Sequence, residues 1–142
     1  MMKPINNNLK IKIIQASETW DLRHRVMAPN RSFDSIKLPK DEQGLHFGLF
    51  LEEKIISVIS LFIENDTAQF RKFATKVSEQ GKGYGSILLN HIIEESIKNN
   101  VKNLWCNARM TALGFYEKFG FEAVSETWID HEIEYVKMER RF

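Results

Sequence analysis

The sequence predicts a mixed α/β (α+β) fold, in which helices cover both faces of a central, mostly antiparallel sheet of about seven strands. Two features of the middle of the chain predict it. Strand-length runs of alternating or β-branched apolar residues occupy 45–51, 55–63 and 67–77, and short polar turns separate them. A helical pattern then runs to about Asn100, with apolar residues at three- and four-residue spacing. Strands joined by short turns form an antiparallel meander, and a helix packs its apolar side on such a sheet.

The remaining segments extend this pattern at both ends. Residues 9–15 are β-branched enough for a first strand, and Ser17 resembles the N-cap of a helix that ends at Ala28. The prolines and charges within 29–44 indicate a loop or a broken helix. Downstream we expect a strand at 102–107, a helix at 111–119 that ends at Gly120, and two closing strands within 121–138.

Length and composition argue against several classes of protein. A chain of 142 residues suits one domain, so we expect residues 1–142 to form a single domain. A net charge of +1 argues against a nucleic-acid-binding surface, and no apolar run approaches the roughly 18 residues of a membrane span. Residues 1–10 contain no apolar stretch, so they do not resemble a secretory signal. We therefore expect a soluble, cytoplasmic protein with no nucleic-acid or membrane partner.

Cysteine and metal chemistry find little support in the sequence. Cys106 is the one cysteine, so no internal disulfide can form, and its apolar neighbours favour a buried thiol over a catalytic one. The four histidines lie far apart, with no second ligand at a recognised metal spacing. We expect no metal in the protein.

The glycine-rich loop at 80–85 carries the strongest functional signal. Gly81, Gly83 and Gly85 stand at every second position and open directly into a helix. Glycine lets a ligand approach the backbone closely, and the free N–H groups and dipole of a helix start attract an anion. The loop therefore suits a pyrophosphate, with Lys82 at its rim and further cations at 71–76.

Two familiar phosphate-binding motifs fit this loop poorly. A Walker A motif needs Gly-Lys-Ser/Thr after its four-residue gap, and the sequence has none. A dinucleotide fingerprint follows the first strand of a βαβ unit, whereas this loop follows three strands with hairpin-like connections. A tight strand-to-helix turn that binds no ligand stays an alternative. Three glycines would, however, weaken the start of the helix without any gain.

Two motifs at the expected separation resemble the GNAT superfamily of acyl-CoA N-acyltransferases. Residues 80–85, Gln-Gly-Lys-Gly-Tyr-Gly, are similar to its Gln/Arg-x-x-Gly-x-Gly/Ala signature. Residues 112–121, Ala-Leu-Gly-Phe-Tyr-Glu-Lys-Phe-Gly-Phe, are similar to its Ala-x-x-Φ-Tyr-x-x-x-Gly-Phe segment, where Φ is apolar. The resemblance covers roughly 9–138 and includes the order of the elements. Residues 22–26 and the closing strands look closest to the ElaA-like bacterial branch.

The resemblance implies where acetyl-CoA, the co-substrate, would bind. Backbone groups of Phe73, Ala74 and Thr75 would pair with the pantetheine arm, as an added strand would. Arg109 stands where the superfamily often has an asparagine that contacts the coenzyme arm, and an arginine there could reach the coenzyme phosphates. The amides expected to hold the pyrophosphate are those of Gln80, Gly81, Lys82, Gly83, Tyr84, Gly85 and Ser86.

The implied activity is transfer of an acetyl group from acetyl-CoA to a primary amine of a small molecule or peptide, by direct attack. The amine must lose a proton, the developing oxyanion needs a donor, and the leaving thiolate benefits from a proton. The resemblance places Tyr116 near the coenzyme sulfur, and a phenol, protonated at neutral pH, can act as the catalytic acid. Periodicity alone would make Tyr116 an ordinary core residue.

The general base is left open by the sequence. Several family members use a carboxylate on the fourth strand, but 67–77 contains none. A proton path through water is as plausible as a side chain; the candidate side chains are His24, Asp130, His131, Glu132 and Tyr135. The missing carboxylate supports a second hypothesis, a non-catalytic acyl-CoA-binding module on a degenerate fold of this family. An exposed edge at the closing strands could support a homodimer.

Overall fold

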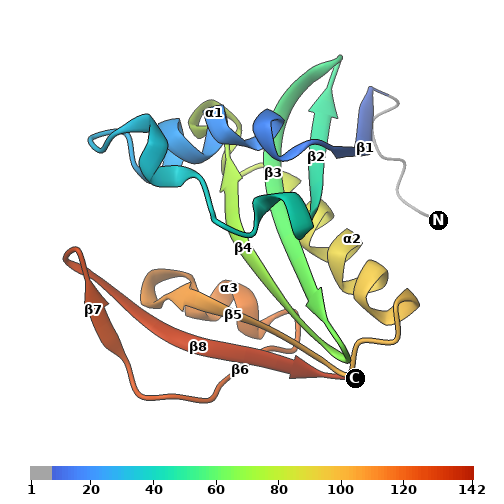
Figure 1. Ribbon diagram of the computed structural model, residues 1–142, viewed down its shortest axis with the longest axis vertical. Helices are drawn as coiled ribbons and strands as arrows, with labels where there is room; N and C mark the ends of the chain where they lie inside the picture. The colour runs from blue at the N-terminus through green and yellow to red at the C-terminus, as the bar shows by residue number, and fades with distance from the viewer. Residues whose placement is uncertain (1–7) are drawn as a thin grey trace.

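The strands form one eight-stranded sheet in the order β1-β2-β3-β4-β5-β8-β6, with β7 paired to β8 (Figure 1). The computed structural model describes residues 8–142. Every strand pairing is antiparallel except that of β4 with β5, so the predicted mixed, mostly antiparallel sheet is confirmed. The strands are β1 (Leu9–Ile14), β2 (Leu45–Leu51), β3 (Lys54–Glu64), β4 (Thr67–Thr75), β5 (Asn103–Arg109), β6 (Glu122–Ala123), β7 (Trp128–Asp130) and β8 (Ile133–Arg141).

The carboxyl end of the chain holds one strand more than the sequence predicted. We expected two closing strands within 121–138, whereas β6, β7 and β8 are three. Between β7 and β8 the chain reverses at His131 and Glu132, whose φ angles are 49° and 68°. Such a tight hairpin turn usually uses asparagine or glycine, so a His-Glu pair gives no sequence signal for it.

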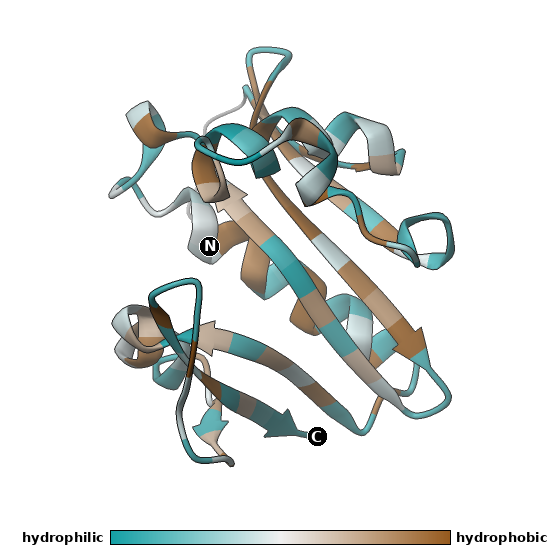
Figure 2. Ribbon diagram, turned by 60° about the vertical axis from the view of Figure 1, so that its left-hand side comes forward, coloured by the Kyte–Doolittle hydropathy of each residue, from teal (hydrophilic) through white to brown (hydrophobic). Residues whose placement is uncertain are grey.

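Helices lie on both faces of the sheet, as predicted. On one face α2 (Tyr84–Lys98) and α3 (Leu113–Glu117) cover the main apolar core. On the other face a helical segment formed by η1 (Ala16–Thr19), α1 (Trp20–Leu22) and the π-helical η2 (Arg23–Met27) packs on β3 and β4. Short 3-10 turns complete the chain: η3 (Phe33–Ile36), η4 (Asp41–Gln43), η5 (Val77–Glu79) and η6 (Met110–Ala112). The apolar residues concentrate in the strands and on the inner sides of the helices, and the connecting loops are hydrophilic (Figure 2).

The first helical segment begins before the predicted N-cap. Gln15, not Ser17, stands at the N-cap of η1. The backbone N–H of Gln15 donates to Oε2 of Glu18 at 2.8 Å, which satisfies a group at the helix start. Ser17 therefore lies inside the first turn, and the prediction of its capping role was wrong. The expectation that residues 1–10 carry no secretory signal rests mainly on residues 1–7, which lie outside the described residues.

β4 and β5 separate after a short parallel pairing. Their register covers only 67–69 of β4 and 103–105 of β5. Beyond it the two strands diverge towards their carboxyl ends, which Figure 1 shows as a V. A bulge lies on the diverging part of β4, where Lys72 and Phe73 stand opposite Ile59 of β3 and Lys72 has a φ of 56°. Within the described residues, no β5 residue pairs with 70–75, so this edge of β4 is open to a ligand.

A buried ion pair attaches the segment at 29–44 to the sheet. The Arg23 guanidinium, 0% exposed, donates from both terminal nitrogens to the two carboxylate oxygens of Asp41, each at 2.9 Å. It also donates to the Ile36 carbonyl at 3.1 Å and to Oγ of Ser60 on β3 at 2.9 Å. His46 completes the network, with its ring nitrogens 2.7 Å from Ser60 Oγ and from the Asp41 carbonyl oxygen. Arg23 therefore fixes η2, the 29–44 segment and β3 together.

Hydrogen bonding decides the protonation of Asp41. Burial by itself raises the pKa of this carboxyl, but hydrogen bonds from Arg23, the Leu38 N–H and the Trp20 indole outweigh burial and lower the pKa below its ordinary value. Asp41 is thus an anion at neutral pH and balances the buried guanidinium.

We expect Asp41→Asn to lower the free energy of unfolding by about 3 kcal/mol or more at pH 7, because it leaves the Arg23 charge buried without its counter-charge. Urea denaturation measures this difference. The control is Asp21→Asn, which breaks the exposed Arg25–Asp21 pair (side chains 68% and 70% exposed) and should cost less than about 1 kcal/mol.

The same comparison has a pH dependence. A carboxyl whose pKa is lowered by folding stabilises the fold above its unfolded pKa of about 3.9, and this stabilisation is lost as pH falls through the folded pKa. The difference between wild type and Asp41→Asn should therefore shrink below about pH 4. Equal stabilities at pH 7 would contradict the role given to this ion pair.

Candidate active site

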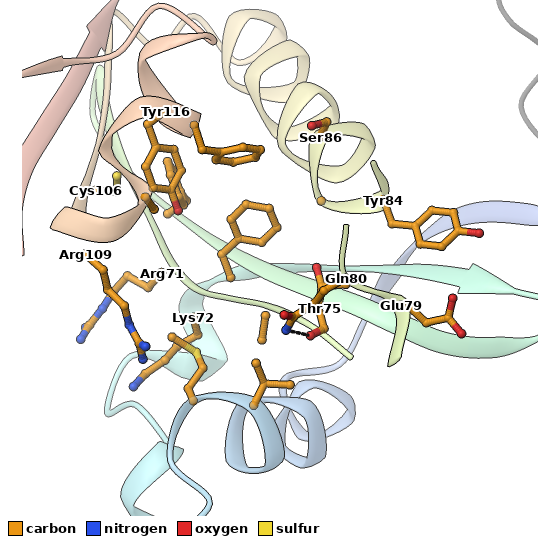
Figure 3. A pocket seen from close by; sticks show the side chains of 18 of the residues that line it. Arg71, Lys72, Thr75, Glu79, Gln80, Tyr84, Ser86, Cys106, Arg109 and Tyr116 are labelled. Atoms are coloured by element: carbon orange, nitrogen blue, oxygen red, sulfur yellow. Dashed lines mark hydrogen bonds between the residues drawn. The ribbon is translucent and has the colours of Figure 1, made fainter. Parts of the chain in front are cut away.

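The divergence of β4 and β5 opens a cavity of about 740 Å³. Several parts of the chain line it: η2, the bulged half of β4, the glycine loop with the start of α2, the end of β5, and η6 with α3 (Figure 3). Tyr135 of β8 adds a further wall. Segments far apart in the sequence therefore meet at this site.

The glycine loop forms one end of the cavity. Gly83 stands at the N-cap of α2 with a φ of 86°, and Gly81 has a φ of 78°, both in the left-handed region that glycine tolerates best. A Cβ built on either residue would meet no atom within 4 Å, so the space beside the backbone is open. No side chain caps the first turn of α2, which leaves its N–H groups and the positive end of its dipole available to a phosphate.

Contacts with β4 hold this loop in place. Nε2 of Gln80 donates to the Thr75 carbonyl oxygen at 2.9 Å, as the dashed line in Figure 3 shows. A Cβ on Gly85 would come within 3.3 Å of the Phe73 ring, so an alanine there would require that ring to shift by a few tenths of an ångström. Lys82 lies outside the cavity lining and forms an ion pair of 3.2 Å with Glu79.

All but one of the residues predicted to bind the coenzyme line the cavity. Lys82, at the rim, is the exception. The bulged strand and the loop contribute adjacent walls, and Arg109 lines the cavity from the end of β5. The predicted residues found in the lining are Phe73, Ala74, Thr75, Gln80, Gly81, Gly83, Tyr84, Gly85, Ser86 and Arg109.

Tyr116 reaches the cavity from α3. Its ring packs against Phe70, Phe115 and Phe121 at centroid distances of 5.6, 5.3 and 6.0 Å, and only 9% of the residue is exposed. Its hydroxyl points into the cavity (Figure 3) and makes no hydrogen bond to another described residue. Both sequence interpretations thus describe part of this side chain: the ring belongs to the core and the hydroxyl to the cavity.

Burial keeps Tyr116 and Cys106 protonated. Burial, and to a smaller extent Cys106, raises the pKa of the Tyr116 phenol well above its ordinary value, and the Arg109 charge offsets part of this rise. Burial raises the pKa of the Cys106 thiol to about 12. At neutral pH the phenol is therefore a proton donor, and the thiol is an unreactive core group, as the sequence predicted.

Cations dominate the part of the cavity away from the glycine loop. Arg71 and Lys72 of β4 and Arg109 of β5 project there together (Figure 3). Burial and then the Arg71 charge lower the pKa of Lys72. The only carboxylate among the lining residues is Glu79, at the glycine loop and paired with Lys82.

Most candidate bases lie elsewhere. His24 is bonded to the Arg31 carbonyl oxygen at 2.8 Å, and His131 pairs with Asp130 at 2.8 Å on the exposed β7–β8 turn. Glu132 lies on the same turn. Of the candidates only Tyr135 lines the cavity, where its ring stacks on Trp128 with centroids 5.9 Å apart.

The comparisons with known proteins agree with this geometry. The model of a protein family described as "Acetyltransferase (GNAT) domain" matches residues 15–142. The chain belongs to the GNAT acetyltransferase family. This acetyltransferase is 30% identical over 127 residues to the uncharacterised N-acetyltransferase YitI of Bacillus subtilis (strain 168), covering 83% of this chain and 85% of that protein.

Two solved structures share the fold of the acetyltransferase at low sequence identity. Escherichia coli ElaA superimposes with a TM-score of 0.82 at 17% identity and covers 94% of this chain and 99% of its own. A GNAT family acetyltransferase from Elizabethkingia anophelis with acetyl-CoA bound gives a TM-score of 0.75 at 17% identity, covering 96% and 100%. The predicted family, fold and enzymatic class are confirmed.

Two further findings concern membranes and metals. Within residues 8–142, no helix is both long and apolar enough to cross a membrane. In the same part of the chain, no three or more His, Cys, Asp or Glu side chains come together as a metal site would require.

The wall of the cavity away from the glycine loop was not predicted from the sequence. Arg71 and Lys72 stood out only as cations near the loop, and no role was predicted for Val26 and Met27 of η2, which also line the cavity. One sequence pattern did indicate the direction of the Arg71 side chain. Side chains alternate between the two faces along β4, and since Ala68 and Phe70 are buried on one face, Arg71 lies on the other. The bulge at Lys72 breaks that alternation and has no sequence signature.

Because its pKa is raised, Tyr116 should ionise at a higher pH than a solvent-exposed tyrosine does. In a spectrophotometric titration, Tyr116→Phe should remove the tyrosine component that ionises at the highest pH. A group whose pKa is raised by folding loses its stabilising effect as pH rises, so the titration is followed by circular dichroism to confirm that the protein is folded. Loss of a component near pH 10 would contradict the buried, neutral phenol.

Proposed function

We propose that this acetyltransferase, acting as a single domain over residues 1–142, transfers an acetyl group from acetyl-CoA to a primary amine of a small molecule or peptide. One observation carries the proposal: a single cavity joins an anion-binding helix start to a free, protonated phenol. The acetyl-CoA bound in the Elizabethkingia anophelis family member supports the same co-substrate here.

The residues of the glycine loop fit the phosphates of the coenzyme. Gly81 and Gly83 leave open space where a side chain would stand, and the N–H groups at the start of α2 have no capping side chain. The free edge of β4 over 73–75 suits the amide groups of the pantetheine arm, which would pair as an added strand does. Acetyl-CoA supplies an activated thioester, so the protein needs no nucleophile of its own.

The transfer makes a carbon–nitrogen bond and breaks a carbon–sulfur bond. The amine loses a proton and the sulfur gains one. The amine nitrogen bonds to the carbonyl carbon of the thioester, the carbon–sulfur bond breaks, and the amine releases its proton to water. The Tyr116 hydroxyl gives a proton to the departing sulfur and regains one from solvent. Because the hydroxyl has no other partner among the described residues, it is available for this role.

The proposal of a coenzyme site is tested by a matched pair of variants at Gly83. Asparagine and aspartate both tolerate a positive φ and have nearly the same shape, but only aspartate adds a negative charge. Coulomb repulsion between unit charges at 4 Å reaches about 4 kcal/mol near a protein surface, so Gly83→Asp should weaken CoA binding at least tenfold more than Gly83→Asn. Calorimetry gives both dissociation constants, and melting temperatures show that the variants are folded.

Acetyl transfer itself is measured with the same proteins as free thiol released from acetyl-CoA in the presence of a panel of amines. Wild type should release thiol only when an amine is present, and Gly83→Asp should be much slower than Gly83→Asn. Equal CoA affinity of the two variants would contradict the proposal that the glycine loop binds the pyrophosphate.

The role of Tyr116 is tested by Tyr116→Phe, which keeps the ring packing and removes only the hydroxyl. General acid catalysis contributes about 10²- to 10⁴-fold, so kcat should fall at least tenfold. CoA affinity should stay within about threefold of wild type, because the phenol acts mainly as charge develops on sulfur. A kcat within about twofold of wild type would indicate that water, and not Tyr116, protonates the sulfur.

A further inference from the structure

Three cations with no part in the proposed proton transfers lie together on one side of the cavity, and one of them, Arg109, is also a predicted coenzyme contact. Arg71, Lys72 and Arg109 form this cation cluster; the first two come from the bulged half of β4 and the third from the end of β5. Figure 3 shows their charged ends together, on the side of the cavity opposite Gln80 and Tyr84.

No carboxylate neutralises the cation cluster. Within the described residues, none of the three side chains has an ion pair or a hydrogen bond to an acidic group. Asp41 is close enough to influence Arg71 and Lys72, but both of its oxygens are bound by the buried Arg23. Partial burial and then the Arg23 charge lower the pKa of Arg71, and the Asp41 charge opposes this shift. Such a cluster attracts an anion.

The position of Arg71 separates this anion site from the phosphate end of the coenzyme. A second cavity, of about 420 Å³, lies beside the first, and Arg71 lines both. Its other walls include Gln69 of β4, Trp105 of β5 and Lys40. The glycine loop contributes nothing to this second cavity. Arg71 is thus shared by two cavities, and Glu64 is the carboxylate that lines the second.

We propose that the acetyl acceptor is a primary amine that also carries a carboxylate or phosphate group, and that the cation cluster binds this anionic group. The proposal rests on the acetyltransferase function above and specifies its substrate class. An alkylamine is a cation at neutral pH and is repelled by the cluster, whereas an anionic group offsets that repulsion. Arginine binds carboxylate and phosphate oxygens with two parallel hydrogen bonds, so Arg71 and Arg109 suit either group.

The cation cluster also favours the reactive form of the bound amine. Nearby positive charge lowers the pKa of an ammonium group, and the neutral amine is the nucleophile. The site therefore has a means of deprotonating its acceptor without the carboxylate that is missing from β4.

The experiment compares matched pairs of amines that differ only in the anionic group. Phenylalanine against phenylethylamine tests a carboxylate, and glucosamine 6-phosphate against glucosamine tests a phosphate. Calorimetry measures their binding to the protein saturated with CoA, so the result does not depend on turnover. The variants are Arg71→Gln and, as a matched control with the same charge change, Arg25→Gln, whose side chain is exposed and lies outside both cavities.

In wild type and in the control Arg25→Gln, at least one amine that carries an anionic group should bind tenfold or more tightly than its partner without that group. Arg71→Gln should reduce that preference to less than threefold. The preferred pair identifies the group as carboxylate or phosphate. No preference, no binding of either anionic amine, or a preference unchanged by Arg71→Gln overturns the inference. A tenfold loss of CoA affinity in Arg71→Gln with unchanged preference also overturns it, and assigns Arg71 to the coenzyme.

Thiol release from acetyl-CoA separates this inference from the proposed function. Tighter binding of an amine with an anionic group, without thiol release from acetyl-CoA with any amine, would overturn the proposed acetyl transfer. It would still support the anion site. Faster acetylation, in both pairs, of the amine that lacks the anionic group would retain the function and overturn the inference.

Discussion

The active site depends on one structural constraint, the separation of β4 from β5 after a short parallel pairing. The two strands share register only over 67–69 and 103–105, and then the bulge at Lys72 and Phe73 turns β4 away. A continuous parallel ladder would close the cavity and use the backbone groups of 70–75. Since the strands diverge, the glycine loop at the end of β4 and Tyr116 after the end of β5 face the same space.

The wall opposite α3 depends on the buried Arg23–Asp41 ion pair. η2 carries both Arg23 and the cavity residues Val26 and Met27, so the position of the guanidinium determines where these two side chains lie. A buried ion pair gains little net stability over an apolar pair of equal volume, because desolvation offsets its attraction. Its geometry is nevertheless specific: both guanidinium nitrogens must meet both oxygens of Asp41. The pair thus fixes a chain segment that has no long helix or strand of its own.

In the cavity, backbone groups are proposed to bind the phosphates, and side chains to supply the proton and the positive charge. Backbone N–H groups at the start of α2 form the proposed anion site, whose donors do not titrate as side chains do. The Tyr116 phenol is kept neutral by the apolar rings around it, and the cation cluster supplies positive potential on the far side. A net charge of +1 for the whole chain conceals this local concentration of positive charge. Charge totals describe the surface as a whole, whereas a binding site depends on where charges lack partners.

The sequence by itself determined the strands β1 to β5, helix α2, the glycine loop and the position of Tyr116 on a short helix. These features follow from neighbours along the chain: the period of apolar residues, the positive φ that glycine accepts, and a motif of ten residues. It could not determine the turn at His131 and Glu132, whose residues are unusual for a hairpin, or the bulge at Lys72. Only the tertiary structure decided that Arg71, Lys72 and Arg109 lie together, with no ion pair to a carboxylate among the described residues. A whole helix separates β4 from β5 in sequence, and the bulge alters where the side chains of β4 point.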